Sequence, residues 1–186
     1  MSDVDAPRSA DPSDQDEPGD PESVARAICL RLLTRRAHTR SELAKALSRR
    51  GVPAEAAHRV LARFVQVGLI DDAAVAQSFA LNQHRARALS ARAVAVRLRE
   101  RGIPEQLVQS AIGQIDAASE ASTAVRLAQR KLRSLRGADP ATQRRRLYAM
   151  LLRRGYSAEL ATRVVGETVG QQDGWSAGEL STESDL

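Results

Sequence analysis

The alternation of apolar and polar positions repeats three times along the chain. The stretches that show it are "LSRRGVPAEAAHRVL" (47–61), "LRERGIPEQLVQSAI" (98–112) and "LLRRGYSAELATRVV" (151–165). Before each central glycine an apolar pair is spaced i, i+4, and after it apolar residues recur at i, i+3, i+4 and i+7. This is the period of an amphipathic helix. The pattern therefore predicts one helical hairpin, written three times.

The predicted buried positions correspond between the copies. Before the glycine they are Leu43 and Leu47, Val94 and Leu98, and Leu147 and Leu151. After it they are Ala57, Val60, Leu61 and Phe64; Val108, Ala111, Ile112 and Ile115; and Ala161, Val164, Val165 and Thr168. A further amphipathic stretch precedes each hairpin, with apolar positions Ala25, Ile28, Cys29 and Leu32; Val75 and Phe79; and Ala121, Ala124, Val125, Ala128, Leu132 and Leu135. Each copy is thus a unit of three helices.

The helix boundaries also carry repeated signals. Each hairpin turn has a glycine where a helix end favours the left-handed conformation, and Pro53 or Pro104 suits the start of the following helix. Thr39 to Glu42, "TRSE", forms a capping box, and Ser90 holds the equivalent place in the second copy. Asp139 and Pro140 start the third copy somewhat earlier.

These elements predict an all-α protein of three tandem three-helix units. We place repeat 1 at 23–70, repeat 2 at 71–117 and repeat 3 at 118–170, between tails at 1–22 and 171–186. Units of this size bury little surface alone and depend on neighbours, so we expect an elongated, curved and modular molecule. The low aromatic content, 3%, also suits closely packed helices better than a sheet.

Charge is distributed unevenly along the chain. The formal net charge is +5, but residues 1–22 carry −7 and residues 171–186 carry −4, which leaves +16 on residues 23–170. The acidic tails, with few apolar residues, are predicted to be disordered, serving solubility or folding back over the basic body. The single Cys29 favours a reducing compartment. Because no signal-like or membrane-length apolar run is present, we expect a cytoplasmic protein that does not associate with a membrane.

The excess of basic side chains supplies the candidate binding residues. A purely solvating surface would mix the two signs, whereas an unbalanced basic surface attracts phosphate or an acidic protein groove. The candidates are Arg35, Arg36, Arg40, Arg49 and Arg50 in repeat 1; Arg92, Arg97, Arg99 and Arg101 in repeat 2; and Arg126, Arg130, Lys131, Arg133, Arg144, Arg145, Arg146, Arg153 and Arg154 in repeat 3.

Several function classes fit the residues poorly. A helix-turn-helix repressor would carry base-contacting side chains after the tight turn, but residues 104–116 contain no basic residue. A single-strand binder normally uses aromatic platforms, and this chain has two Phe, two Tyr and one Trp. The three histidines and Cys29 lack zinc-site spacing, and no phosphate loop or nucleophile motif is present. We therefore expect no catalysis, no metal, no cofactor and no small-molecule substrate, and we expect Asp71 and Asp72 to cap a helix.

The chain resembles the RecX family of regulatory proteins, which control the RecA recombinase. The resemblance lies in the tandem units, in "CLRLLTRRAHTRSELAKALSRRG" (29–51) and in "GLIDD" (68–72), and covers roughly residues 24–169. The family usually has an aromatic residue after the acidic pair, where this chain has Val75 and a later Phe79. The resemblance implies a protein without enzymatic activity that binds along the groove of the RecA filament on single-stranded DNA. It also implies that the protein suppresses strand exchange, ATP hydrolysis and coprotease activity in DNA repair and recombination.

The hypothesis from the sequence is therefore a RecA filament regulator, monomeric, whose repeated basic faces contact several subunits or phosphates at once. Removing repeat 3 should then cost filament binding more than it costs the folding of repeats 1 and 2. Two alternatives stay open, a nonspecific basic DNA-binding protein and a helical-repeat scaffold for another acidic partner. Both predict the same fold and the same charge.

Overall fold

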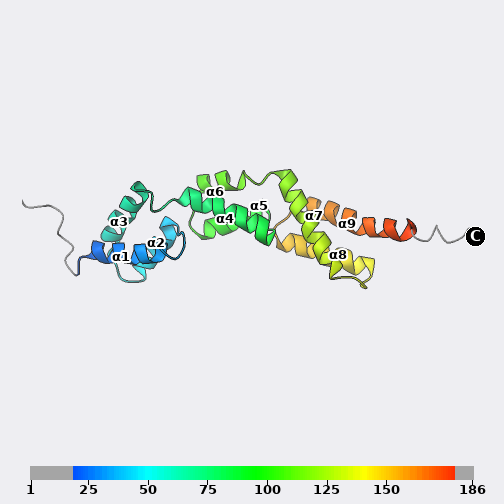
Figure 1. The fold of residues 1–186 in the computed structure, drawn as a ribbon, viewed down its shortest axis with the longest axis horizontal. Coiled ribbons are helices and arrows are strands. Elements are labelled where there is room, and N and C mark those ends of the chain that lie inside the picture. Colours follow the sequence, from blue (N-terminus) through cyan, green and yellow to red (C-terminus); the bar gives the residue numbers. More distant parts are fainter. Residues whose placement is uncertain (1–18, 179–186) are drawn as a thin grey trace, which may run out of the picture. The chain divides into compact units, whose positions relative to one another are not determined.

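The computed structural model describes the backbone of residues 19–178 and the side chains of residues 19–170. This part of the chain forms nine α-helices and contains no strand, which confirms the predicted fold class (Figure 1). The predicted disorder of the tails falls largely outside the described residues. The helices are α1 (Pro21–Leu33), α2 (Arg40–Ser48), α3 (Ala54–Gln66), α4 (Asp72–Arg87), α5 (Ala91–Glu100), α6 (Glu105–Ile112), α7 (Ala117–Arg133), α8 (Pro140–Arg153) and α9 (Ala158–Gly178).

Each group of three helices has its own hydrophobic core. The three predicted i, i+4 pairs are fully buried: Leu43 and Leu47, Val94 and Leu98, and Leu147 and Leu151. The stripe that follows each turn is also mostly buried, including the polar Thr168, whose hydroxyl donates to the Val164 carbonyl at 2.6 Å. Burial of these side chains, at about 25 cal/mol per Å² of apolar surface, is the main stabilising contribution within each repeat.

The predicted helix boundaries are present. Thr39 and Glu42 form a reciprocal capping box, and the side chains of Asp71, Ser90 and Asp139 each accept from the backbone N–H three residues on. The turn glycines adopt left-handed backbone angles, with φ of +75° at Gly51 and +87° at Gly155. These caps satisfy N–H groups that have no partner inside their helices.

Three details differ from the sequence predictions. The buried face of α4 is formed by Ala76, Ala80 and Gln83, while Val75 and Phe79 are only half-buried, because the small alanines let the neighbouring helices approach closely. In repeat 2, Ile112 is half-buried and Ile115 lies beyond the end of α6, although Ile115 still packs into the core.

The tail boundaries also need correction. Asp20 caps α1 through its side chain, and the helix begins at Pro21, inside the segment assigned to the acidic tail. Glu22 belongs to α1 and forms an ion pair with Arg59 on α3. At the other end, α9 continues to Gly178, past the predicted limit at residue 170. The tails predicted from charge and low hydropathy are therefore longer than the helix boundaries allow at both ends.

The chain divides into two compact units, one containing repeat 1 and ending at Ile70, the other containing repeats 2 and 3 and starting at Asp71. Repeats 2 and 3 keep separate apolar cores, and Ala88 from the end of α4 joins the core of repeat 3. Repeat 1 is thus a compact unit of its own, and repeats 2 and 3, which share contacts, form a joined pair.

Candidate functional site

The joint between repeats 2 and 3 is centred on the buried His84. Its Nδ1 lies 2.9 Å from the Leu89 carbonyl, which can only accept, so Nδ1 carries the donated proton. Its Nε2 faces the hydroxyls of Thr123 at 3.1 Å and Ser119 at 3.3 Å, both from α7. Arg126 donates to the Thr123 hydroxyl at 2.8 Å. A line of polar contacts thus connects the end of α4 with α7.

A second set of contacts joins the turn before α5 to repeat 3. The Tyr156 hydroxyl donates to the Ala88 carbonyl at 3.1 Å, and the Ser90 N–H donates to the Arg154 carbonyl at 3.1 Å. The Ala91 N–H donates to the Glu120 carboxylate at 2.8 Å. Burial, and then the negative charge of Glu120, raise the pKa of Tyr156 to about 12. The phenol therefore stays a hydrogen-bond donor at all physiological pH values.

Gly155 allows the closest approach in this joint. A Cβ at this position would lie 2.5 Å from Ser90 Oγ and 2.7 Å from Ala93 Cβ. Glycine is required here for two reasons: the backbone is left-handed, and a side chain would have no space. The joint brings basic side chains of the two repeats to the same hollow.

Basic side chains line three adjoining surface hollows in repeats 2 and 3. The hollows have volumes of about 660, 440 and 450 Å³, and Arg153 lines all three of them. We call their nine cations the cationic track: Arg87, Arg92, Arg97, Arg130, Lys131, Arg145, Arg146, Arg153 and Arg154. Glu100 is the one acidic residue among the described residues that line these hollows.

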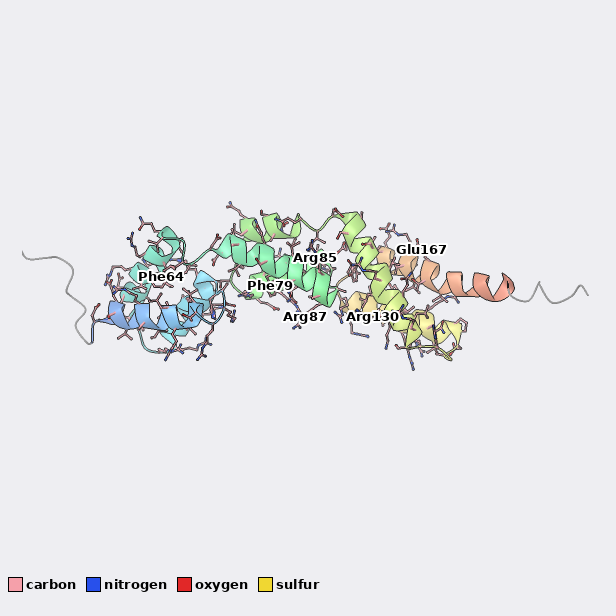
Figure 2. The ribbon with its side chains drawn as sticks, viewed as in Figure 1. Phe64, Phe79, Arg85, Arg87, Arg130 and Glu167 are labelled. Carbon is pink, nitrogen blue, oxygen red and sulfur yellow. The ribbon has the colours of Figure 1, made fainter. Side chains whose placement is uncertain are left out.

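Helix ends explain how these cations come together. Arg87, Arg97, Arg130 and Arg153 lie in the last turns of α4, α5, α7 and α8, where the helix dipole favours positive charge. Figure 2 labels Arg87 at the end of α4 and Arg130 on α7, two residues from different repeats that line the same hollow. Among the ion pairs of the described residues, none involves a cation of the track.

Two of the predicted binding residues have an acidic or aromatic partner within repeat 2. Arg99 makes two hydrogen bonds to Glu105, at 2.8 and 2.7 Å, and together with Gln109 it lowers the pKa of that carboxyl to about 2. The Arg101 guanidinium lies 5.0 Å from the ring centre of Phe79, a cation–π contact. Both side chains therefore already have partners within repeat 2.

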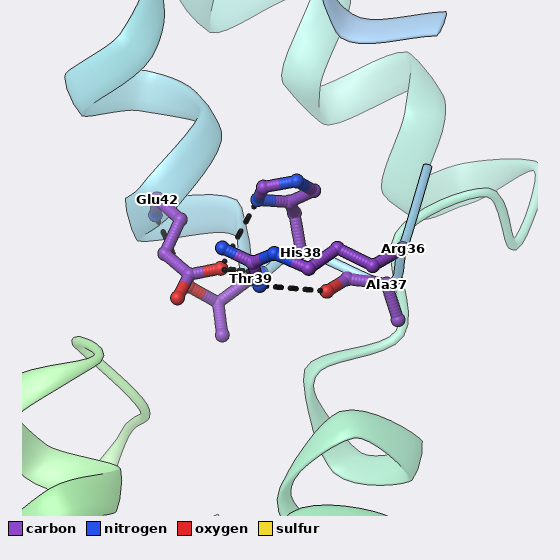
Figure 3. Close-up of polar contacts among 5 residues, drawn as sticks. All are labelled: Arg36, Ala37, His38, Thr39 and Glu42. Carbon is purple, nitrogen blue, oxygen red and sulfur yellow. Dashed lines mark hydrogen bonds and ion pairs between the residues drawn. The ribbon is translucent and has the colours of Figure 1, made fainter. Parts of the chain in front are cut away.

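Arg36 is engaged in a similar way in repeat 1. Figure 3 shows the Glu42 carboxylate meeting Arg36, His38 and the Thr39 N–H, at 3.4, 3.2 and 3.2 Å. Arg36 also donates to the Ala37 carbonyl at 3.2 Å. The same carboxylate thus completes the α2 cap and neutralises this cation.

The remaining predicted residues lie on other surfaces. Arg35, Arg40, Arg49 and Arg50 are exposed in repeat 1, and Arg50 donates to the Ala46 carbonyl at 3.0 Å. Arg126, Arg133 and Arg144 are exposed in repeat 3 but do not line the three hollows. The structure therefore brings together eight of the predicted residues, all from the joined pair of repeats.

Arg87 is the track residue missing from the candidate set. Its basic neighbours in sequence are Arg85 and His84, and nothing in their spacing distinguishes the residue that faces the hollow. Ala88, the next residue after Arg87, has a φ of +49°, an angle uncommon for residues other than glycine and one that the sequence does not indicate. A left-handed residue turns the chain sharply, and Ala88 makes this turn between Arg87 and the start of α5.

The described residues offer little for other chemistry. Cys29 is buried, which raises the pKa of its thiol, and no group of three His, Cys, Asp or Glu in this part of the chain is placed to hold a metal. None of the helices in this part of the chain has both the length and the apolar character of a membrane span.

Comparisons with known proteins agree with one another. Family models described as the first, second and third three-helix domains of RecX match residues 25–64, 71–112 and 118–165. Proteins named "Regulatory protein RecX" are similar to this chain. The one from Streptomyces coelicolor is 47% identical over 155 residues, 83% of this chain and 82% of that protein, and the one from Thermobifida fusca is 45% identical over 160 residues, 86% of each.

Solved structures support the fold alone. The crystal structure of RecX from Lactobacillus salivarius is similar with a TM-score of 0.72 at 17% identity, covering 80% of this chain and 97% of that one. A second crystal structure, of "regulatory protein RecX", gives 0.69 at 24% identity and covers 82% of this chain and 72% of the other.

Proposed function

Because the chain belongs to the RecX family of regulatory proteins, we propose that it binds the RecA filament formed on single-stranded DNA in the cytoplasm and lowers its activities. Strand exchange, ATP hydrolysis and coprotease activity would all fall, because each requires the active filament. The protein does this by binding, without catalysis of its own.

The cationic track is the observation that carries the proposal. A filament on DNA is a repeating polyanion that offers phosphates and acidic protein surface at regular intervals. The track presents nine cations with a single acidic neighbour, on two repeats that share a joint. Arg97 and Arg154 are held by hydrogen bonds within the chain, and such preorganised cations lose little side-chain entropy when a partner binds. Arg35, Arg40 and Arg49 in repeat 1 supply a second basic surface on a separate compact unit.

Two attached basic surfaces suit a repeating target better than a single site. Once one unit is bound, the other searches at a high effective concentration, so that two weak contacts give a tight complex. A helical-repeat scaffold for another acidic partner would use the same surfaces. The family match favours the filament, and the experiment below separates the two.

The test is RecA ATP hydrolysis on single-stranded DNA, with this protein titrated at amounts well below one per RecA subunit. Binding to the same DNA without RecA is measured in parallel under the same salt conditions. Inhibition far below saturation of the naked DNA is the expected result. Inhibition that appears only when the protein coats the DNA would reject filament regulation in favour of nonspecific DNA binding. No inhibition at any ratio would reject both.

A further inference from the structure

Five arginines from two repeats surround the hollow of about 440 Å³ in the track. Arg87 and Arg97 come from repeat 2, and Arg130, Arg153 and Arg154 come from repeat 3. The hollow has a volume of about 440 Å³, so the five guanidinium groups repel one another across a short distance. No described carboxylate forms an ion pair with any of them. An external anion bound here would offset this repulsion.

Neutral partners hold these side chains without cancelling their charge. Arg97 donates to the Gln83 side-chain oxygen at 2.9 Å, and Gln83 is itself buried. Arg154 donates to the Arg87 carbonyl across the joint. The backbone of Arg154 in turn accepts from the Ser90 N–H. The hollow therefore exists only while repeats 2 and 3 are joined, and its full positive charge remains available.

We propose that this hollow binds phosphodiester groups of a single nucleic-acid strand, and that the bound phosphates lock repeats 2 and 3 together. Phosphate fits because the planar guanidinium donates two parallel hydrogen bonds to it. A polymer fits better than a small anion because the cations continue into the adjoining hollows, to Arg92 in one and to Lys131, Arg145 and Arg146 in the other.

The contact is to the backbone rather than to the bases. Tyr156 is the one aromatic residue that the structure places along these three hollows, and its ring is buried with its hydroxyl bonded to Ala88. Base stacking needs an exposed aromatic face, which these walls do not offer. Binding should therefore tolerate any base sequence. The inference rests on the proposed function for its setting, but its test needs no RecA.

The experiment compares two triple variants of the full chain with equal loss of charge. The track variant is Arg97→Gln, Arg130→Gln and Arg153→Gln, and the control variant is Arg31→Gln, Lys45→Gln and Arg63→Gln, three exposed cations of repeat 1 outside both proposed binding surfaces. Binding of a fluorescent oligo-dT strand is followed by anisotropy over a salt series. Each phosphate contact contributes about 0.7 to the slope of log K against log salt, so the track variant should lose about 2 in slope, with at least a tenfold weaker Kd at low salt. The control should keep the wild-type slope.

The locking of the joint has its own readout. Oligo-dT should raise the unfolding temperature of the wild type and of the control, because a ligand that binds only the folded state stabilises it. It should not raise that of the track variant. Arg130 has no hydrogen bond or ion pair with another described residue, so Arg130→Gln alone preserves the fold and should give a partial loss of both effects.

Several outcomes would overturn the inference. One is an equal loss of binding in the two triple variants, and another is equally tight binding of polyglutamate of matched charge, which would point to an acidic protein instead. Wild-type protein that inhibits RecA but does not bind oligo-dT would overturn this inference and leave the proposed function standing. Oligo-dT binding through the track without any effect on RecA would overturn the proposed function and leave this inference standing.

Discussion

At the scale of single residues, the joint between repeats 2 and 3 depends on buried polar groups that must keep their protons. Tyr156 is the clearest case, since its buried hydroxyl reaches the Ala88 carbonyl from 68 residues away in sequence. The hydrogen bond requires the neutral phenol. Its contribution to stability is therefore tied to the pKa of this side chain.

We predict that Tyr156 titrates near pH 12 rather than at the usual value near 10. Because the folded state holds this proton more tightly than the unfolded chain, its contribution to stability is complete below pH 10. It is lost as the pH rises towards 12. Phenolate absorbance in a Tyr148→Phe background isolates this group. A midpoint near pH 10 in the folded protein would show that the hydroxyl is exposed and that the joint is looser than described.

These residues also show what a sequence can reveal. Leu43 and Leu47, or Thr39 and Glu42, were predictable because both partners belong to one helix and its periodicity places them. His84 and Thr123 were not, because they lie 39 residues apart and periodicity carries no information on which helices meet. The excess of arginine predicted a basic surface. Which arginines and lysines line the cationic track depends on how repeats 2 and 3 meet, and the sequence does not show this.

At the scale of elements, the turn between the second and third helix of each repeat has one sequence pattern and more than one role. Gly51 and Gly155 both have left-handed backbones. No atom outside its own turn lies within 4 Å of a Cβ built at residue 51, whereas one built at residue 155 would collide with Ser90 and Ala93. The third turn thus closes a hairpin and also packs against the preceding repeat.

We predict that Gly51→Ala lowers the free energy of unfolding by about 1–2 kcal/mol, the cost of a left-handed backbone for an L-residue. Gly155→Ala should cost about 1–3 kcal/mol more, because the added methyl group must displace atoms in the joint. Urea unfolding of both variants measures the difference. Gly155→Ala should also weaken oligo-dT binding, since it disturbs the hollow, while Gly51→Ala should not. Equal effects of the two substitutions would mean that the third turn has no role beyond its hairpin.

At the scale of the whole molecule, the division into two compact units changes which truncations are meaningful. The sequence predicted tandem units that depend on their neighbours, and the last two repeats share the contacts of His84, Tyr156 and Gly155. Their apolar cores remain separate, so the joint is mainly polar. A polar joint stabilises by positioning groups rather than by burying apolar area, and its loss should weaken repeat 2 without exposing a large hydrophobic surface.

We predict that fragments 1–70 and 71–186 fold separately, and that their summed circular dichroism and unfolding curves reproduce those of the full chain. Cutting after residue 117 instead should leave repeat 1 unchanged and lower the unfolding temperature of repeat 2, because His84 and the Ala91 N–H lose their partners in repeat 3. Fragment 71–186 should retain the oligo-dT binding assigned to the track, and fragment 1–117 should lose it. An unchanged unfolding temperature of repeat 2 in fragment 1–117 would restore the simpler picture of three independent modules, in which the hollow between repeats 2 and 3 has no fixed geometry for phosphate to recognise.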